Sequence, residues 1–522
     1  MSFRKRSPWI TLATIGALGG AAWAQAEPAA GPEPKEGDAA HAATLVLAPE
    51  QLASLTEELR DLRGQLEELE RRDPLDELRD LRGQLDELER RGPRLGYART
   101  GLFWTTRDGL IRLRPTLRLQ TQAYAFYPRL DRPNTPRDSF FLRRARAEFF
   151  GALFGARVQF NVSVEAAFLI NGRAPAGDEY VRFDLSDAFK LQLGQFNVPF
   201  TLDNRSMEPY LDFLERSFVV RNLGTANKDP GVMAFGKLLG GRLFYEGGLF
   251  NGGEINTRNA DNQFDVVGRA YARPLAGSTS PWRALQVGGS ASWGAREGTN
   301  DPYLGGMIPS DRSWLSTAFG VGLFPVSYNA ADVNRTAIGV VPEGHMWRAA
   351  AELVVPWDRF ILRAEYLHLD SDIDEKLRVG EAVVREGGRL SADGAYVELG
   401  YWLLGDPTAF PELGSTPDSV VSVKETDVPR DWHLATFVRS NYVDANYRAG
   451  RTVFVGALGP SQVDGRYRLF DVQGIVNLWW TRHLRFSLGH TYTRLLEGDH
   501  AQLPTAGQRN IHETSARVQL YL

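Results

Sequence analysis

The sequence predicts an all-β protein: a sixteen-stranded antiparallel transmembrane β-barrel preceded by a short α-helical coiled coil. Three observations predict it. Many segments alternate apolar and polar residues over about ten positions, which is the length that a tilted strand needs to cross a bilayer. Aromatic residues gather near the ends of these segments, as they do at the interfaces of membrane barrels. The connections alternate between short and long, as expected for short periplasmic turns and long external loops.

The composition excludes several other classes of protein. The 522 residues are 43% hydrophobic and their mean hydropathy is −0.30, values that do not indicate a helical membrane protein. There is no Cys, which excludes a disulfide-stapled secreted domain and any thiolate metal site. The formal net charge of −4 offers no basic surface that would indicate a nucleic-acid partner.

The N-terminal residues predict export. Residues 1–24 combine the basic start Arg4-Lys5-Arg6 with a short apolar run from Trp9 to Ala22, and they read as a signal peptide with cleavage after Ala24. The apolar run is short for a membrane anchor, which is the alternative interpretation. Residues 25–49 are rich in Ala, Pro, Glu and Gly and predict a flexible linker.

Residues 50–91 predict a coiled coil. The sequence ELRDLRGQLEELERR at Glu58–Arg72 recurs as ELRDLRGQLDELERR at Glu77–Arg91, and its leucines step by three and four residues. Asp73-Pro74 interrupts the helix between the two copies. Because one amphipathic helix cannot bury such a seam alone, we expect partner chains. A single helix docked on the main domain is the alternative.

Residues 97–522 predict the barrel. In Ile111–Tyr124 the arginines share one face and the leucines the other, and Pro115 predicts either a bulge or the start of the strand. The same alternation predicts further strands at Arg157–Glu165, Tyr180–Leu185, Phe189–Val198, Arg242–Leu249, Phe360–Tyr366, Ala395–Leu403, Leu484–Leu488 and Ser515–Leu522.

The connections give the strand count. Tight turns are expected at Leu239–Gly241, Pro356–Asp358 and Arg482–His483. Long external segments are expected at Arg129–Arg137, Val198–Pro230, Arg296–Gly344, Asp370–Leu390 and Ala445–Arg466. Threading strands between these connections gives about sixteen, an even number as in single-chain bacterial barrels. The long segment Gly405–Arg430 departs from the pattern, because it falls on the periplasmic side.

Four segments resemble the phosphate-selective porins O and P. Asp108–Gln120 and Phe141–Arg146 are similar to the first two strands of that family, and Gly194–Asp203 followed by Phe213–Ser217 is the most specific match. The resemblance implies a sixteen-stranded porin in the outer membrane of a Gram-negative bacterium, assembled as a homotrimer in the lipid. It also implies that the third external loop, Val198–Pro230, folds inward. A coiled coil before the barrel would suit trimer association or contact with peptidoglycan.

A pore selects ions by the charge on its constriction. Guanidinium groups suit phosphate-like anions because they donate in a planar, bidentate way and stay charged. The candidates for pore lining and anion binding are Arg112, Arg114, Arg118, Arg144, Arg146, Arg205, Arg216, Arg221 and Lys228. The alternative is that they form structural ion pairs with nearby carboxylates such as Glu148, Glu165, Asp203, Glu208 and Glu215.

The sequence thus predicts passive diffusion of small solutes, above all small phosphate-like anions, without enzyme activity, cofactor or metal. The histidines lack metal-ligand spacing. One alternative is a structural tether, in which the barrel is plugged and the coiled coil attaches it to the cell wall. Another is an outer-membrane lipase using Ser487 and His490, which lack an evident acidic partner.

Overall fold

The structure is a computed structural model. It describes residues 57–65, 94–98, 101–127, 138–167, 177–225, 227–253, 255–256, 259, 262–280, 282–296, 338–377, 384–405, 432–453, 461, 464–481, 483–498 and 509–522. Contacts divide the chain into two units, Met1–Glu89 and Arg90–Leu522. In the first unit residues 57–65 are helical. The predicted signal peptide, the linker and the remainder of the predicted coiled coil lie outside the described residues, so those assignments stay predictions.

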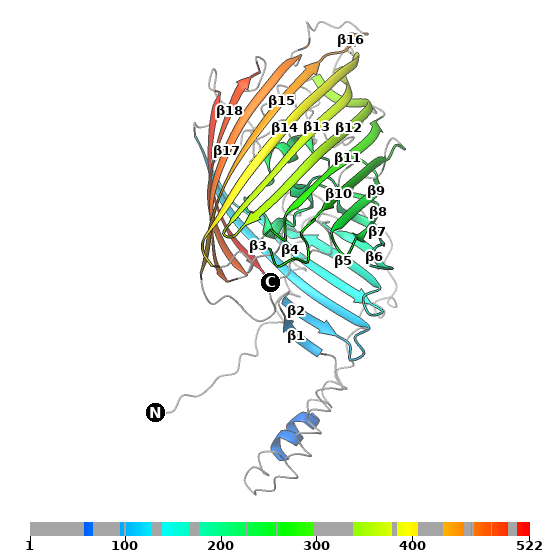
Figure 1. Ribbon diagram of the computed structural model, residues 1–522, viewed down its shortest axis with the longest axis vertical. Helices are drawn as coiled ribbons and strands as arrows, with labels where there is room; N and C mark the ends of the chain where they lie inside the picture. The colour runs from blue at the N-terminus through cyan, green and yellow to red at the C-terminus, as the bar shows by residue number, and fades with distance from the viewer. Residues whose placement is uncertain are drawn as a thin grey trace, which may run out of the picture. The chain divides into compact units, whose positions relative to one another are not determined.

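The second unit contains a closed antiparallel barrel of sixteen strands in its described part, which confirms the predicted fold class of the barrel. Each strand pairs with its neighbour in sequence, and β19 returns to pair with β3, with Ala516 opposite Ala123. Figure 1 shows the strands side by side in chain order, from blue to red. The barrel strands are β3 (Ile111–Tyr127), β4 (Ser139–Leu153), β5 (Val158–Glu165), β6 (Glu179–Asp184), β7 (Lys190–Asn197), β8 (Lys228–Leu238), β9 (Leu243–Phe250), β10 (Asp265–Ala272), β11 (Gln286–Arg296), β12 (Ile338–Trp357), β13 (Phe360–Leu377), β14 (Val384–Leu404), β15 (His433–Arg448), β17 (Gly465–Thr481), β18 (Leu484–Glu497) and β19 (Asn510–Tyr521).

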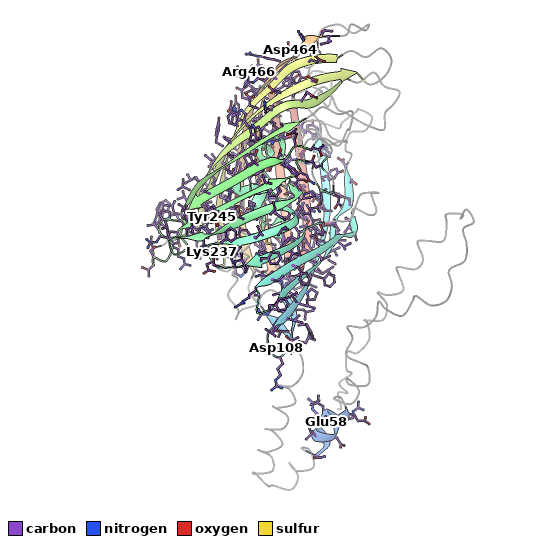
Figure 2. The ribbon with its side chains drawn as sticks, turned by 90° about the vertical axis from the view of Figure 1, so that its right-hand side faces the viewer. Glu58, Asp108, Lys237, Tyr245, Asp464 and Arg466 are labelled. Carbon is purple, nitrogen blue, oxygen red and sulfur yellow. The ribbon has the colours of Figure 1, made fainter. Side chains whose placement is uncertain are left out.

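Three short strands are added to this ring. The hairpin of β1 (Arg94–Ala98) and β2 (Gly101–Thr105) joins the start of β3, and β16 (Arg451–Thr452) pairs with β14. Figure 2 shows Asp108, in the turn between β2 and β3, at the opposite end of the barrel from Asp464 and Arg466 at the start of β17. The start of β3 and the start of β17 therefore lie at opposite ends of the barrel (Figure 2).

The two faces of the barrel wall differ as the alternation predicts. On β3, Leu117 is 46% exposed while Arg118 beside it is 2% exposed. On β5, Val162 and Val164 are exposed while Asn161 is buried. Apolar side chains therefore face the surroundings and polar side chains face the interior, which is the polarity of a membrane barrel.

The wall of β13, β14 and β15 reverses this polarity near the long-connection end. On β13, Leu367 and Leu369 are fully buried inside, whereas His368 lies on the outward face. On β14, Leu390 and Ala392 are buried in the same way. Segment Asp370–Leu390, predicted as an external loop, is largely strand. The prediction was wrong because β13 runs on to Leu377 and β14 already begins at Val384.

Pro115 lies inside β3, opposite Phe149 of β4. Leu117 exchanges backbone hydrogen bonds with Leu522, so the polar groups of Leu117 point toward the side of β19. Pro115, two residues earlier, faces the same side. Strand β19 ends at Tyr521, so its ladder does not extend to a position opposite Pro115. The missing N–H of Pro115 therefore breaks no rung between these strands, which explains why proline is tolerated.

The predicted tight turns are confirmed at three places, where β8 leads to β9, β12 to β13 and β17 to β18. The first turn contains Leu239, Gly240 and Gly241 with φ values of 52°, 65° and 82°. Two consecutive glycines suit this left-handed backbone because they carry no Cβ.

Candidate functional site

The segment between β7 and β8, residues 198–227, carries three short helices. They are α4 (Leu202–Arg205), the 3₁₀ helix η1 (Glu208–Tyr210) and α5 (Phe218–Leu223). Pro199 ends the β7 ladder, and Thr201 then caps α4 by accepting a hydrogen bond from the Asn204 N–H at 3.1 Å. Ser217 caps α5 through the Val220 N–H at 3.0 Å. We call residues 198–227 the β7–β8 segment.

The start of the β7–β8 segment is held by two carboxylates of the barrel wall. Glu365 on β13 accepts hydrogen bonds from the Leu202 and Asp203 N–H groups at 2.5 and 3.1 Å. On β9, Glu246 binds the Arg205 guanidinium through both oxygens, at 2.8 and 3.2 Å. Bidentate pairs of this kind fix geometry as well as charge. Arg205, a predicted pore residue, therefore anchors the segment to β9.

Glu208, at the middle of the segment, binds the arginines of β3 and β4. Its carboxylate lies 3.1 Å from Arg118, 2.6 Å from Arg144 and 3.9 Å from Arg146. Burial opposes ionisation of Glu208, but these three guanidinium charges outweigh it and hold the pKa of Glu208 well below its usual range. Glu208 is therefore a carboxylate that stays charged in mild acid.

The predicted arginines of β3 and β4 belong to a charge-balanced network. Arg146 lies 3.4 Å from Glu148, 3.2 Å from Glu165 and 3.6 Å from Asp178. Lys228 forms an ion pair with Asp178 as well. The four cations are Arg118, Arg144, Arg146 and Lys228, and the four carboxylates are Glu148, Glu165, Asp178 and Glu208. These basic residues therefore come together, but each has a carboxylate partner.

Glu215 is a second meeting point of the segment with the wall. Its carboxylate binds Arg143 of β4 at 2.8 and 2.9 Å and Arg517 of β19 at 2.9 Å. Its carbonyl oxygen accepts from Arg439 of β15 at 2.9 Å. Burial opposes ionisation here too, and the arginines, led by Arg143, outweigh it and lower the pKa of Glu215. One residue thus ties the segment to three strands.

Arg143 reaches this position through a β-bulge. Gln120 of β3 lies opposite Arg144 and Thr121 opposite Leu142, so Arg143 is the extra residue of β4. Strict alternation would place its side chain on the outer face beside lipid. Arg143 is absent from the predicted residues, because strict alternation was assumed through β4, whereas the bulge shifts its phase by one residue. An arginine at a position assigned to the lipid face was the available signal.

Arg485 and Arg517 are further guanidinium groups that the sequence analysis did not select. Arg485 of β18 donates to the Leu211 carbonyl at 2.8 Å and to Gln519 Oε1 at 3.2 Å. Within the described part of the chain it has no carboxylate at ion-pair distance. Arg517 shares Glu215 with Arg143. Among the described residues, Arg485 and Arg517 therefore have one carboxylate at ion-pair distance between them, Glu215, which Arg517 shares with Arg143. The alternation predicted at Leu484–Leu488 places Arg485 on the polar, inward face, so this pattern could have identified it.

The remaining predicted residues have different surroundings. Arg112 is exposed near the start of β3, and the Arg114 guanidinium lies 4.4 Å from the centre of the Phe150 ring. Arg216 is buried and donates to backbone carbonyls of its own segment, those of Asp203 and Ser206. Arg221 is half-buried on α5. Arg112 and Arg114 are thus separate from the network, and Arg216 stabilises the fold of the β7–β8 segment.

Helix α5 makes the apolar contact between the segment and the wall. Its residues Phe218, Val219 and Leu223 are fully buried in one hydrophobic cluster with the reversed faces of β13, β14 and β15. Gly394 of β14 leaves the space for this helix, because a Cβ there would lie 2.7 Å from Leu223 Cδ1 and 2.8 Å from Val219 Cγ1. The reversed polarity of the wall is therefore explained by α5.

The model of the family described as "Phosphate-selective porin O and P" matches residues 116–521. The chain belongs to this family. As a porin it is a channel protein of the outer membrane of Gram-negative bacteria, and its family indicates a channel rather than an enzyme. No helix in the described part of the chain is both long and apolar enough to span a bilayer.

The comparison with solved structures matched outer-membrane proteins, including the following three. The loop L8 deletion mutant of OmpT of Vibrio cholerae is 11% identical, with a TM-score of 0.46, covering 79% of this chain and 100% of that chain. The anion-selective porin from Comamonas acidovorans is 8% identical, with a TM-score of 0.45 and coverage of 79% and 100%. The outer membrane channel DcaP of Acinetobacter baumannii is 8% identical, with a TM-score of 0.42 and coverage of 78% and 97%. The comparison with curated proteins gave no match.

Proposed function

We propose that this porin conducts small anions, phosphate-like ones included, and that the β7–β8 segment is an inward-folded third loop that forms its constriction. The segment contacts six strands, β3, β9, β13, β15, β18 and β19. These contacts support the proposed role, because a segment that reaches strands on different sides of the barrel crosses its interior. A constriction formed by charged side chains sets the selectivity of a pore.

The observation that carries the anion preference is the guanidinium excess at Arg485 and Arg517. The predicted arginines of β3 and β4 are balanced by carboxylates, so their net field is small. Arg485 and Arg517 meet neutral oxygens or share one carboxylate. An anion that passes along β18 and β19 would meet donors already oriented toward the interior.

We further propose that the porin is a homotrimer and that residues 50–91 contribute to its association as a coiled coil. The leucine seam supports this, because a two-leucine stripe needs helices from other chains to cover it. Contact of the same coiled coil with peptidoglycan remains a separate proposal, supported by its position before the barrel in the sequence.

The closed, tether-like barrel is a second candidate that one observation favours. The inward side chains of the described strands are almost all buried, Gln120, Asn441 and Glu513 among them. A wide aqueous pore would leave such side chains exposed to water. The β7–β8 segment therefore leaves at most a narrow path, and conduction measurements decide between the two candidates.

The deciding experiment is conductance of the purified protein in planar bilayers with KCl and potassium phosphate. An anion porin gives ohmic steps and a reversal potential on the anion side in a salt gradient. The double variant R485Q/R517Q should lose most of that preference, whereas the exposed-site control R112Q should keep it. An unchanged permeability ratio in the double variant would remove the selectivity proposal. If the wild-type protein gives no current at all, the closed, tether-like barrel is the candidate function that is kept.

A further inference from the structure

The outer face of the barrel carries two histidines that come together only in the fold. His490 lies on β18 and His512 on β19, and the register places His490 opposite Thr514 and Tyr492 opposite His512. The histidines are thus diagonal neighbours on one face. Both share the outward face with the exposed Leu488. His490 is exposed and His512 half-buried.

Their position along the strands is near the rim with the long connections. Strand β19 begins at Asn510, two residues before His512, and β18 continues for seven residues after His490 to Glu497. The rings of Tyr492 and Tyr127 lie 4.9 and 6.2 Å from the His512 ring. Tyrosines of this kind are typical of the membrane–water interface. Water and dissolved ions therefore have access to the pair.

The nitrogen geometry points to a chelate. His490 Nε2 lies 3.2 Å from His512 Nδ1, and His490 Nδ1 lies 2.9 Å from the Thr514 hydroxyl. When Nδ1 donates its proton to that hydroxyl, the lone pair of His490 is on Nε2, facing His512. A hydrogen bond from the second ring nitrogen is what orients histidine ligands in metal sites.

The separation of the two nitrogens fits one metal ion. Zinc binds histidine nitrogen at about 2.0–2.1 Å in tetrahedral geometry, which puts two such nitrogens roughly 3.3 Å apart. The observed 3.2 Å is close to that separation, so both nitrogens can bind one ion once the rings turn their lone pairs toward it. We propose that His490 and His512 form a two-imidazole site for a divalent transition metal, Zn²⁺ or Cu²⁺, with water completing the coordination.

The competing interpretation is a plain histidine–histidine hydrogen bond, and it predicts a different response to metal. Two imidazoles with borderline hardness prefer Cu²⁺ over Zn²⁺ and exclude Mg²⁺ and Ca²⁺, which select oxygen ligands. The site should also lose its metal as pH falls, because protons compete for the nitrogens. A hydrogen bond alone would show none of this.

The experiment uses the full-length, tag-free porin in detergent micelles, titrated with Cu²⁺ and Zn²⁺ by calorimetry and studied with Cu²⁺ by electron paramagnetic resonance. Wild type should bind about one Cu²⁺ with hyperfine coupling from two nitrogens, and Zn²⁺ more weakly. H490A and H512A should each lower the affinity at least tenfold and remove the two-nitrogen signal. T514V, which removes the orienting hydroxyl, should weaken binding by a smaller factor.

The matched control is H345A, which removes another exposed outward histidine, one that stacks on Trp293 at 5.7 Å. It should leave Cu²⁺ binding unchanged. The proposal is overturned if wild type shows no two-nitrogen Cu²⁺ signal, or if that signal survives in both H490A and H512A. Retained heat-modifiable mobility on gels would show that the variants are folded.

Discussion

At the scale of single residues, the interior of this porin is governed by pairing. Glu208 joins Arg118 and Arg144, and Glu215 joins Arg143 and Arg517. A buried charge that loses its partner is costly, whereas a neutral replacement of a whole pair is not. The carboxylates of the β7–β8 segment therefore matter as much for ion selection as the arginines do.

Replacing Glu208 by Gln tests this pairing. Arg118 and Arg144 would keep their charge without the carboxylate that joins them, so we expect an increased anion-to-cation permeability ratio. We also expect a loss of stability of roughly 3–5 kcal/mol, the usual cost of breaking one side of a buried pair. The measurements are reversal potential in a salt gradient and the unfolding midpoint in denaturant.

The control is Glu497→Gln, which breaks the more exposed pair with Arg468. Surface pairs contribute roughly 0–1 kcal/mol, so this variant should differ little from wild type in either measurement. Equal effects of the two substitutions would contradict the pairing argument.

The pH dependence follows from the lowered pKa of Glu208. A depressed carboxyl pKa gives stability that is full above the unfolded value and is lost as pH falls through the folded value. Because the folded pKa lies well below the ordinary one, Glu208 stays ionised at about pH 4. The difference in reversal potential between wild type and E208Q should therefore persist from pH 7 to about pH 4. Convergence of the two near pH 4 would indicate an ordinary carboxyl group.

At the scale of elements, α5 explains why part of the barrel wall carries apolar side chains on its inner face. Its buried face meets β13, β14 and β15, and Gly394 supplies the space between them. The wall at this height is therefore a small two-layer core and not a water-lined surface.

Gly394→Val should displace α5 and loosen the β7–β8 segment. The added methyl groups would overlap Val219 and Leu223, and overpacking of this kind costs about 1–3 kcal/mol. We expect larger single-channel conductance with more frequent current fluctuations. Gly474→Val on β17 is the matched control, because a Cβ there has nothing within 4 Å. Identical conductance of both variants would argue against a role of α5 in the constriction.

The alternation of apolar and polar residues predicted strands correctly where one face meets lipid and the other meets polar groups. It failed where an apolar helix packs against the inner face of the wall. Strand Arg157–Glu165 was predicted almost to the residue, because lipid lies on one side and polar groups on the other. The predicted strand that starts at Phe360 stops at Tyr366, whereas β13 runs to Leu377. The apolar residues Leu367 and Leu369, which follow, face inward and are buried against α5. That burial depends on a helix from a distant part of the chain, which local periodicity does not contain.

The candidate site was likewise predicted in part, where local alternation was sufficient, and missed where distant contacts decide. The arginines of β3 and β4 were selected by inward alternation, and the structure brings Arg118, Arg144 and Arg146 together. Their carboxylate partners could be named only as candidates, because pairing depends on strand register and on the path of the β7–β8 segment. Arg143 required knowledge of a bulge, which a backbone can insert without any change in composition.

At the scale of the whole molecule, the chain divides into two units, and all sixteen strands of the barrel belong to Arg90–Leu522. Deletion of residues 25–91 should therefore leave barrel folding intact, measured by circular dichroism and by the heat-modifiable shift on gels. If the predicted coiled coil supports a trimer, the truncated protein should dissociate at lower temperature than the full-length porin. An oligomer of unchanged thermal stability would assign association to the barrel alone.

The partners of the β7–β8 segment have a consequence for biogenesis. Arg485 and Arg517, which hold Leu211 and Glu215, belong to the last two strands and lie 274 and 302 residues further along the chain. Contacts between residues so far apart in the chain form slowly, because the entropy of closing the intervening loop is lost before the contact offsets it. We therefore expect the contacts of Leu211 and Glu215 with Arg485 and Arg517 to be among the last to form, after the final strands have joined the barrel. Resistance of the segment to protease would report that last step, after the wall itself is complete.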